Sequence, residues 1–239
     1  MLNDPESNLE ALQSNAYPGR GIIMGLSPDG SNFVQVYWIM GRSSNSRNRI
    51  FVHDGNTVRT APFDESRVED PSLIIYNCVR VHGDTHIVSN GDQTDTIFDA
   101  LKRGGDFESA LKTRTFEPDA PNFTPRISGI LTPGQEQAYS LSVLKTIDNN
   151  PHQATRQFYH YAAPIPGIGH YVSTYIGDGS PLPSFVGEPQ PMPLHDDPDE
   201  ALERFWDALG EDNRVSLLVK YLSVESGESQ IRIMNANTL

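Results

Sequence analysis

The chain has 239 residues, of which 37% are hydrophobic and 21% are charged, and its formal net charge is −13. This acidic balance argues against a nucleic-acid-binding protein, which would normally present a basic face, and no segment approaches the roughly 20 apolar residues that span a bilayer. With a single cysteine, Cys78, and no secretory pattern at the start, we expect a cytoplasmic globular protein with a sizeable core and with neither nucleic acid nor membrane as partner.

The first half of the chain predicts strands joined by tight turns. Residues 1–16 are polar with a weak helical pattern, and we expect them to be an appendage. The strands that follow are rich in β-branched and aromatic residues, and turn formers such as Pro28 and Gly30 separate them. They are predicted at residues 21–26, 33–40, 49–54, 57–63, 72–81 and 86–90. A helix from about Asp95 to Lys102 and a second over 107–114, capped by Asp106, come next.

The second half returns to strands around one proline-rich segment. Residues 178–198 contain six prolines, which exclude a long strand or helix, so we expect an ordered loop. Asp197 and Pro198 then predict a helix start. The strands are predicted at residues 126–131, 138–147, 154–163, 170–177, 214–224 and 230–235. The simplest architecture is one α+β domain with two stacked sheets.

An arginine cluster at 41–49, "GRSSNSRNR", is the first candidate binding segment. Arg42, Arg47 and Arg49 lie within eight positions among small hydroxyl residues. Guanidinium groups form planar forks that pair with phosphate or carboxylate, so this segment predicts an anion site. A solvated loop without function is the alternative.

The stretch "VSNGDQTDTI", residues 88–97, places six polar or small residues at a strand-to-helix corner. Thr94 or Asp95 can cap the helix, and a helix N-terminus favours anions. Capping alone is the alternative, but it does not account for Asn90 and Gln93. Asp92 and Asp95 could also bind magnesium, which prefers carboxylate oxygens.

The loop "RTFEPDAPNFTPR", residues 114–126, offers the carboxyl group of Glu117 between Arg114 and Arg126. A carboxylate beside arginines can act as a general base, orient a neighbour or form an ion pair. Cys78 lies in an apolar strand and is expected to be a buried core residue. His82 and His86 flank a turn and have no third ligand, so we predict no zinc site.

Several of these segments resemble the archaeal-type inosine monophosphate (IMP) cyclohydrolase family. The likeness covers residues 17–176 and includes "YPGRG", "GRS…NR", "IYNCVRVHGDTHIVSNGDQTDTI", "TFEPDAPNFTPRI" and "YVSTY". The resemblance implies a four-layer αββα sandwich similar to N-terminal-nucleophile hydrolases. It would consist of one domain over 17–239 that includes the 178–198 loop, with 1–16 as an extension.

The activity that the resemblance implies is the last step of purine synthesis. The carboxamide nitrogen of 5-formamidoimidazole-4-carboxamide ribonucleotide attacks the formyl carbon, and water leaves to give IMP. The partner is then a small purine nucleotide, with neither cofactor nor metal required. Assembly into a homo-oligomer is left open. Tyr17 stands roughly where related folds have a processed nucleophile, so we predict no self-cleavage.

The resemblance also suggests site residues. Four are expected to be catalytic, with Tyr76 and Glu117 handling protons and the formyl oxygen: Tyr76, Glu117, Arg42 and Asn90. The others are expected to bind substrate: Arg20, Asn48, Arg49, Asn77, Thr94, Asp95 and Arg126. The alternatives are an amidohydrolase of the same fold and a nucleotide-binding regulator without catalysis.

Overall fold

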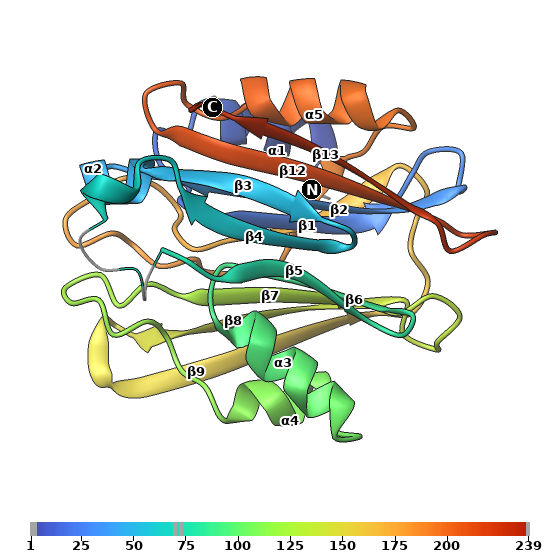
Figure 1. The fold of residues 1–239 in the computed structure, drawn as a ribbon, viewed down its shortest axis with the longest axis horizontal. Coiled ribbons are helices and arrows are strands. Elements are labelled where there is room, and N and C mark those ends of the chain that lie inside the picture. The colour runs from blue at the N-terminus through green and yellow to red at the C-terminus, as the bar shows by residue number, and fades with distance from the viewer. Residues whose placement is uncertain (1–3, 69–70, 72–73, 238–239) are drawn as a thin grey trace.

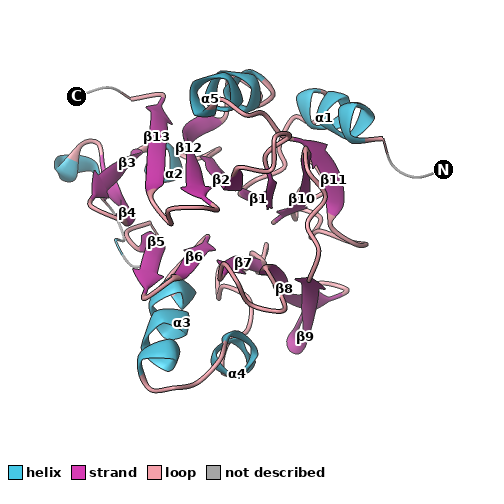
Figure 2. Ribbon diagram, turned by 90° about the vertical axis from the view of Figure 1, so that its right-hand side faces the viewer, coloured by secondary structure: helices cyan, strands magenta, loops and turns pink. Residues whose placement is uncertain are grey.

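The computed structural model describes residues 4–68, 71 and 74–237. Two antiparallel sheets face each other (Figure 1). Helices α1 (Pro5–Gln13) and α5 (Pro198–Asp207) lie on the outer side of one sheet, and α3 (Gln93–Lys102) and α4 (Phe107–Lys112) lie on the outer side of the other (Figure 2). The expected α+β class with two stacked sheets is confirmed. Among the described helices, none is long and apolar enough to cross a membrane.

The first sheet has six strands in the order β11-β10-β1-β2-β12-β13. Its central strands are almost wholly buried because helices cover one face and the second sheet covers the other. Along β2, Tyr37 faces the second sheet and Trp38 faces the helices, as the two-residue period of a strand requires. The strands are β1 (Gly21–Leu26), β2 (Asn32–Met40), β10 (Ile168–Ser173), β11 (Gln190–Pro193), β12 (Arg214–Ser223) and β13 (Ser229–Asn235).

The second sheet has seven strands in chain order, each hydrogen-bonded to the next. They are β3 (Arg49–Asp54), β4 (Thr57–Pro62), β5 (Asn77–His82), β6 (Thr85–Ser89), β7 (Arg126–Leu131), β8 (Tyr139–Ile147) and β9 (Asn150–Tyr161). Gly129 on β7 lets the two sheets approach closely, since a Cβ atom there would lie 2.2 Å from the sulfur of Met24. The apolar side chains between the sheets form the central core.

The helix starts agree with the sequence in two of three cases. Asp106 accepts a hydrogen bond from the backbone of Ser109, and Asp197 accepts bonds from the first turn of α5. The prediction that Thr94 or Asp95 caps α3 is wrong. The N-cap position belongs to Asp92, whose side chain makes no capping bond, because its carboxylate is paired with arginines instead.

Other differences concern segments expected to be irregular or extended. Residues 41–49 contain a one-turn helix, α2 (Ser44–Arg47), which a reciprocal capping box of Ser43 and Ser46 stabilises. A single-turn 3-10 helix, η1 (Glu65–Arg67), follows β4. The strand predicted over 72–81 begins only at 77, and residues 72–73 of that prediction lie outside the described residues.

The N-terminal segment is packed rather than protruding. In α1, Leu9 and Leu12 are buried in the outer core cluster beneath the helices. Arg204 of α5 also pairs with Glu6. The expectation of an appendage missed these contacts because two leucines in a polar segment give only a weak helical signal.

Candidate active site

The predicted site residues gather at one end of the sandwich. They lie before or at the start of β1, β3, β5 and β7, and after β2 and β6. Because the strands are antiparallel, these chain positions meet at the same end of both sheets. A cavity of about 260 Å³ opens there. Its walls include Arg20, Arg42 and Glu117 from the predicted set, together with Tyr17, Asp119, Thr124, Tyr175 and Leu182.

Arg20 enters the cavity between two glycines that cannot be replaced without collision. Gly19 has a φ of +72°, and a Cβ atom there would lie 2.2 Å from Oγ1 of Thr174. At Gly21 a Cβ atom would lie 2.1 Å from the ring of Trp38. The "PGRG" sequence therefore lets the backbone run close to its neighbours while it presents the guanidinium group.

Glu117 is a carboxyl group removed from water beside cationic side chains. Its residue is 5% exposed, and its backbone N–H donates to the carbonyl of Thr124 at 2.9 Å. Burial raises the pKa of Glu117 to about 7, although the guanidinium groups of Arg20 and Arg126 act in the opposite direction. A carboxyl group that titrates near neutral pH can both accept and return a proton.

Tyr76 is not among the residues that line the cavity, but it is buried close enough to Arg20 for the two side chains to interact electrostatically. The hydroxyl oxygen of Tyr76 lies 2.8 Å from that of Tyr37 on β2. Burial raises the pKa of Tyr76, with Arg49 and Arg20 partly opposing the shift. The hydroxyl therefore stays protonated at neutral pH and is suited to donate a hydrogen bond rather than to act as a base.

Arg49 is fully buried and, like Tyr76, is not among the residues that line the cavity. Its Nε donates to the carbonyl of Ser46 at 2.8 Å, but Nη1 and Nη2 have no hydrogen-bond partner within the described part of the chain. Burial and then the charge of Arg20 lower the pKa of Arg49. Charged donors are costly to bury unpaired. The guanidinium groups of Arg49 and Arg20 are therefore suited to bind an oxygen-rich ligand.

Arg42 lies at the exposed side of the cavity and is engaged by the proline-rich loop. Its guanidinium group stacks over the ring of Tyr17, pairs with Asp178 at 2.5 Å and donates to the carbonyl of Gly179 at 3.0 Å. Asn122 holds the same loop by accepting from the backbone N–H of Leu182 at 3.1 Å. The loop thus forms one wall of the cavity.

A hydrogen-bond network in the cavity lining joins Asp119, from the 114–126 loop, to Thr124 and Tyr175, two residues that the sequence did not single out. Thr124 bonds through its hydroxyl group to Asp119 and, at 2.6 Å, to the hydroxyl oxygen of Tyr175. Tyr37 was also missed, because a tyrosine inside an apolar strand looks like any core residue. In the sequence, the nearness of Asp119 to Glu117 is the signal that points to this network.

The side chains of the corner at residues 90–95 are engaged in internal hydrogen bonds. Asn90 donates to the carbonyl of Pro125 at 2.9 Å and accepts from Nε2 of Gln93 and the backbone N–H of Ile127 at 2.8 and 2.9 Å. Thr94 donates to the carbonyl of Gly91. The expectation that Asn90 contacts substrate is therefore not supported, because its amide group already holds the corner to β7.

Three further predicted binding residues also lie in internal contacts. Asn48 makes paired hydrogen bonds with the backbone of Asp64. Asn77 donates to Asp95 at 3.1 Å, and Asp95 also pairs with Arg80 at 2.7 Å. None of these three predicted residues, Asn48, Asn77 and Asp95, lines the cavity.

Arg126 pairs with Asp92, one of the two carboxylates for which magnesium binding is an alternative. It donates to Asp92 at 2.6 Å and to Gln93 at 2.7 Å. A Cβ atom at Gly91 would lie 2.9 Å from Nη1 of Arg126 and 3.3 Å from the carboxylate of Glu117, so the corner packs directly against both. Within the described ranges, no group of three or more His, Cys, Asp and Glu side chains gathers as a metal site would require.

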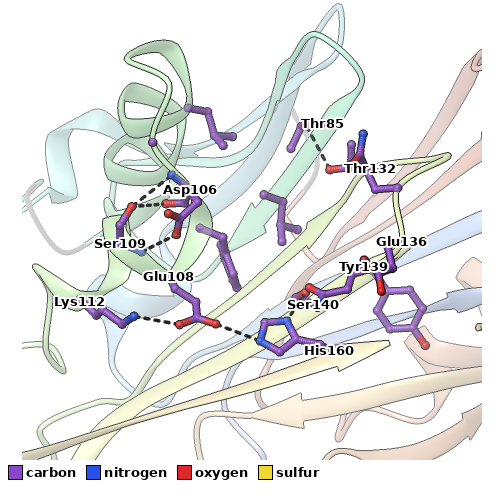
Figure 3. Close-up of a pocket in the computed structure, with 16 residues that line it drawn as sticks. Thr85, Asp106, Glu108, Ser109, Lys112, Thr132, Glu136, Tyr139, Ser140 and His160 are labelled. Carbon is purple, nitrogen blue, oxygen red and sulfur yellow. Dashed lines mark hydrogen bonds and ion pairs between the residues drawn. The ribbon is translucent and has the colours of Figure 1, made fainter. Parts of the chain in front are cut away.

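A larger groove of about 750 Å³ lies elsewhere, beside α4 (Figure 3). His160 links Ser140, at 2.8 Å, to Glu108, at 3.1 Å, and Glu108 also binds Lys112. Ser140, the second residue of β8, pairs with Ile130 on β7 and His160 on β9. Through Ser140, His160 and Glu108, these hydrogen bonds join α4 to the sheet.

Comparison with known proteins assigns the family. The family described as IMP cyclohydrolase-like protein matches residues 17–227. The chain belongs to this family. The IMP cyclohydrolase of Methanococcus maripaludis strain C7 is 38% identical over 127 residues, which cover 52% of this chain and 61% of that protein. The IMP cyclohydrolase of Methanopyrus kandleri is 36% identical over 123 residues, 50% of this chain and 60% of its own length. The chain thus spans about three fifths of the curated relatives that it matches.

Proposed function

We propose that this protein is an IMP cyclohydrolase. It would close the ring of 5-formamidoimidazole-4-carboxamide ribonucleotide and release water. The observation that carries the proposal is Glu117, a buried carboxyl group with a pKa of about 7 in a cavity that also receives Arg20 and Arg42. The names of the relatives, over the part of their length that aligns, support the same reaction.

The reaction is intramolecular, so positioning supplies much of the rate. The carboxamide nitrogen forms a bond to the formyl carbon and loses one proton to Glu117. Tyr76 donates a hydrogen bond to the developing oxyanion, and Glu117 returns the proton to that oxygen. The hydroxyl group then leaves as water with the second proton, which comes from the formamido N–H as the C=N bond forms. Glu117 ends as a carboxylate, ready for another turnover.

Arg20, Arg42 and Arg49 differ in how deeply they are buried. Arg49 is fully buried, and together with Arg20 it would donate to the carboxamide and formyl oxygens, where their unused N–H groups stabilise negative charge. The Arg42 side chain is 38% exposed at the mouth, and we assign it the 5′-phosphate, which would take the place of Asp178. The reactive end of the nucleotide is then innermost, where water is excluded.

The proposal extends to the fold. The arrangement of helices outside both sheets supports a four-layer αββα sandwich related to N-terminal-nucleophile hydrolases, with residues 17–239 as one unit. Tyr17 is buried inside the chain, where its ring stacks with Tyr175. It carries neither thiol nor hydroxymethyl group, so the reaction needs no self-processing. If the protein does process itself, the intact mass of the active protein would correspond to a chain that begins near residue 17.

The test is conversion of the formylated carboxamide ribonucleotide by purified protein in the presence of EDTA, followed by the absorbance of IMP against an uncatalysed control. Fast conversion that EDTA does not affect is the expected result. Folded protein that binds IMP without forming it would instead indicate a nucleotide-binding regulator.

A further inference from the structure

A second group of buried polar side chains lies between the sheets, apart from the cavity. Gln35 on β2, Lys220 on β12 and His86 on β6 are 2%, 1% and 6% exposed. Gln35 and Lys220 are direct partners in the six-stranded sheet. Nε2 of Gln35 reaches the backbone carbonyl of His86 on the opposite sheet at 3.4 Å. The three side chains therefore converge in the interior.

Each of these side chains has a polar atom without a protein partner. Within the part of the chain that the structure describes, this holds for Nζ of Lys220, Nδ1 of His86 and Oε1 of Gln35. On the same and neighbouring strands, the surroundings of this group are apolar core side chains. They are formed by the core residues Met24, Phe33, Val88, Leu131, Leu218 and Leu222.

The electrostatics show that the group lacks a counter-charge. Burial lowers the pKa of Lys220 to about 8, and no carboxylate acts against that shift. Burial, and then the charge of Lys220, lower the pKa of His86 to about 4. At neutral pH the histidine is thus uncharged while the lysine keeps most of its charge. An isolated ammonium group in an apolar interior is costly unless it is paired.

We propose that Lys220, His86 and Gln35 form an internal binding site for one small monovalent anion of the halide type. The ammonium group and the Nδ1–H tautomer of His86 donate to the anion, whose charge balances Lys220. A water molecule would meet the hydrogen-bonding needs of the site but would leave its charge uncompensated. This site is independent of the proposed ring closure and of the cavity that serves it.

The first test is the melting temperature at neutral pH and constant ionic strength, with bromide replacing gluconate. Linkage predicts a rise of about 3–5 °C for each tenfold increase in bromide above its dissociation constant in a protein of this size. Lys220→Met should abolish the rise, because it removes the charge and keeps the side-chain length. Lys102→Met, at an exposed lysine, is the matched control and should respond like the wild type.

The second test needs no variant. Wild-type crystals grown in bromide should show an anomalous scattering peak within hydrogen-bonding distance of Nζ of Lys220. Density without an anomalous peak at that position would mean that the site holds water, and it would overturn the proposal. An equal bromide response in wild type and Lys220→Met would overturn it as well.

Discussion

Glu117 is a residue whose chemistry depends strongly on its surroundings. Burial moves its pKa from the ordinary value of 4.5 to about 7, and the proposed reaction uses its carboxylate form. The value of kcat/KM should therefore rise with pH up to about 7 and then level off. Glu117→Gln should lower turnover by about 10²- to 10⁴-fold and remove this rise. Glu108→Gln, in the distant groove, is the matched control. A wild-type rate that falls as pH increases would contradict the assigned role.

The same shift predicts how stability depends on pH. Because the folded-state pKa of Glu117 is raised, the folded protein binds more protons than the unfolded chain between about pH 4.5 and 7. The contribution of Glu117 to the unfolding free energy is complete below pH 4.5 and is lost as the pH rises through 7. Relative to Glu117→Gln, the unfolding free energy of the wild type should fall by up to about 1.4 kcal/mol per pH unit in this window. Chemical denaturation of both proteins across the window measures the difference, and parallel curves would contradict the prediction.

Tyr76 should act through its hydroxyl group alone. Tyr76→Phe keeps the ring in the core but removes the proposed donor to the oxyanion, so turnover should fall by about 10²- to 10³-fold. Tyr37 loses its 2.8 Å partner, at a cost of about 1 kcal/mol in stability. Tyr159→Phe is the control, because that hydroxyl donates to the carbonyl of Gly187 at 3.0 Å and belongs to β9, at the opposite edge of the seven-stranded sheet from β3. Wild-type turnover in Tyr76→Phe would remove the tyrosine from the mechanism.

Replacement of Arg49 should lower activity without lowering stability. Arg49→Met removes two buried donors that have no acceptor among the residues the structure describes, so we expect kcat/KM to fall by about 100-fold or more. The melting temperature of the empty protein should stay the same or rise, because a buried charge is removed. Thermal denaturation and kinetics on the same sample measure both effects, with the exposed Arg59→Met as control. A variant that unfolds while its residual activity per folded molecule is normal would make Arg49 purely structural.

At the scale of elements, the corner between β6 and α3 should behave as a support rather than as a contact to substrate. Asn90→Ala removes three hydrogen bonds, one to Gln93 within the corner and two to Pro125 and Ile127 at the start of β7. We expect a loss of about 2–3 kcal/mol in unfolding free energy. Turnover per folded molecule should change only a few-fold. Denaturant titration and kinetics together decide, and a large loss of turnover with little loss of stability would return Asn90 to the catalytic set.

Most elements could be predicted because their signals are local. The apolar runs and turn residues around β1 to β4 place these strands within a residue or two, and Asp197 with Pro198 identifies the start of α5. Long-range contacts produced the differences. Asp92 does not cap α3 through its side chain because Arg114 and Arg126, distant in sequence, hold its carboxylate. Nothing near residue 92 in the sequence indicates those partners.

At the scale of the whole molecule, the candidate site exists only because two sheets meet. Arg20 precedes β1 of one sheet, whereas Arg49 begins β3 of the other, and Glu117 comes from the loop before β7. The resemblance to a family could suggest these residues, and the cavity brings Arg20, Arg42 and Glu117 together. The resemblance could not separate these residues from Asn48, Asn77 and Asp95, because an internal polar contact and a substrate contact require the same residue types.

The central claim is that the buried carboxyl group of Glu117 performs ring closure in this cavity. The most direct measurement is the single-turnover rate of IMP formation by wild type and Glu117→Gln, with enzyme in excess, EDTA present and IMP binding measured in parallel. We predict fast closure by the wild type and a rate lower by at least about 10²-fold in the variant, with IMP affinity changed only a few-fold. Equal rates in the two proteins would contradict the account.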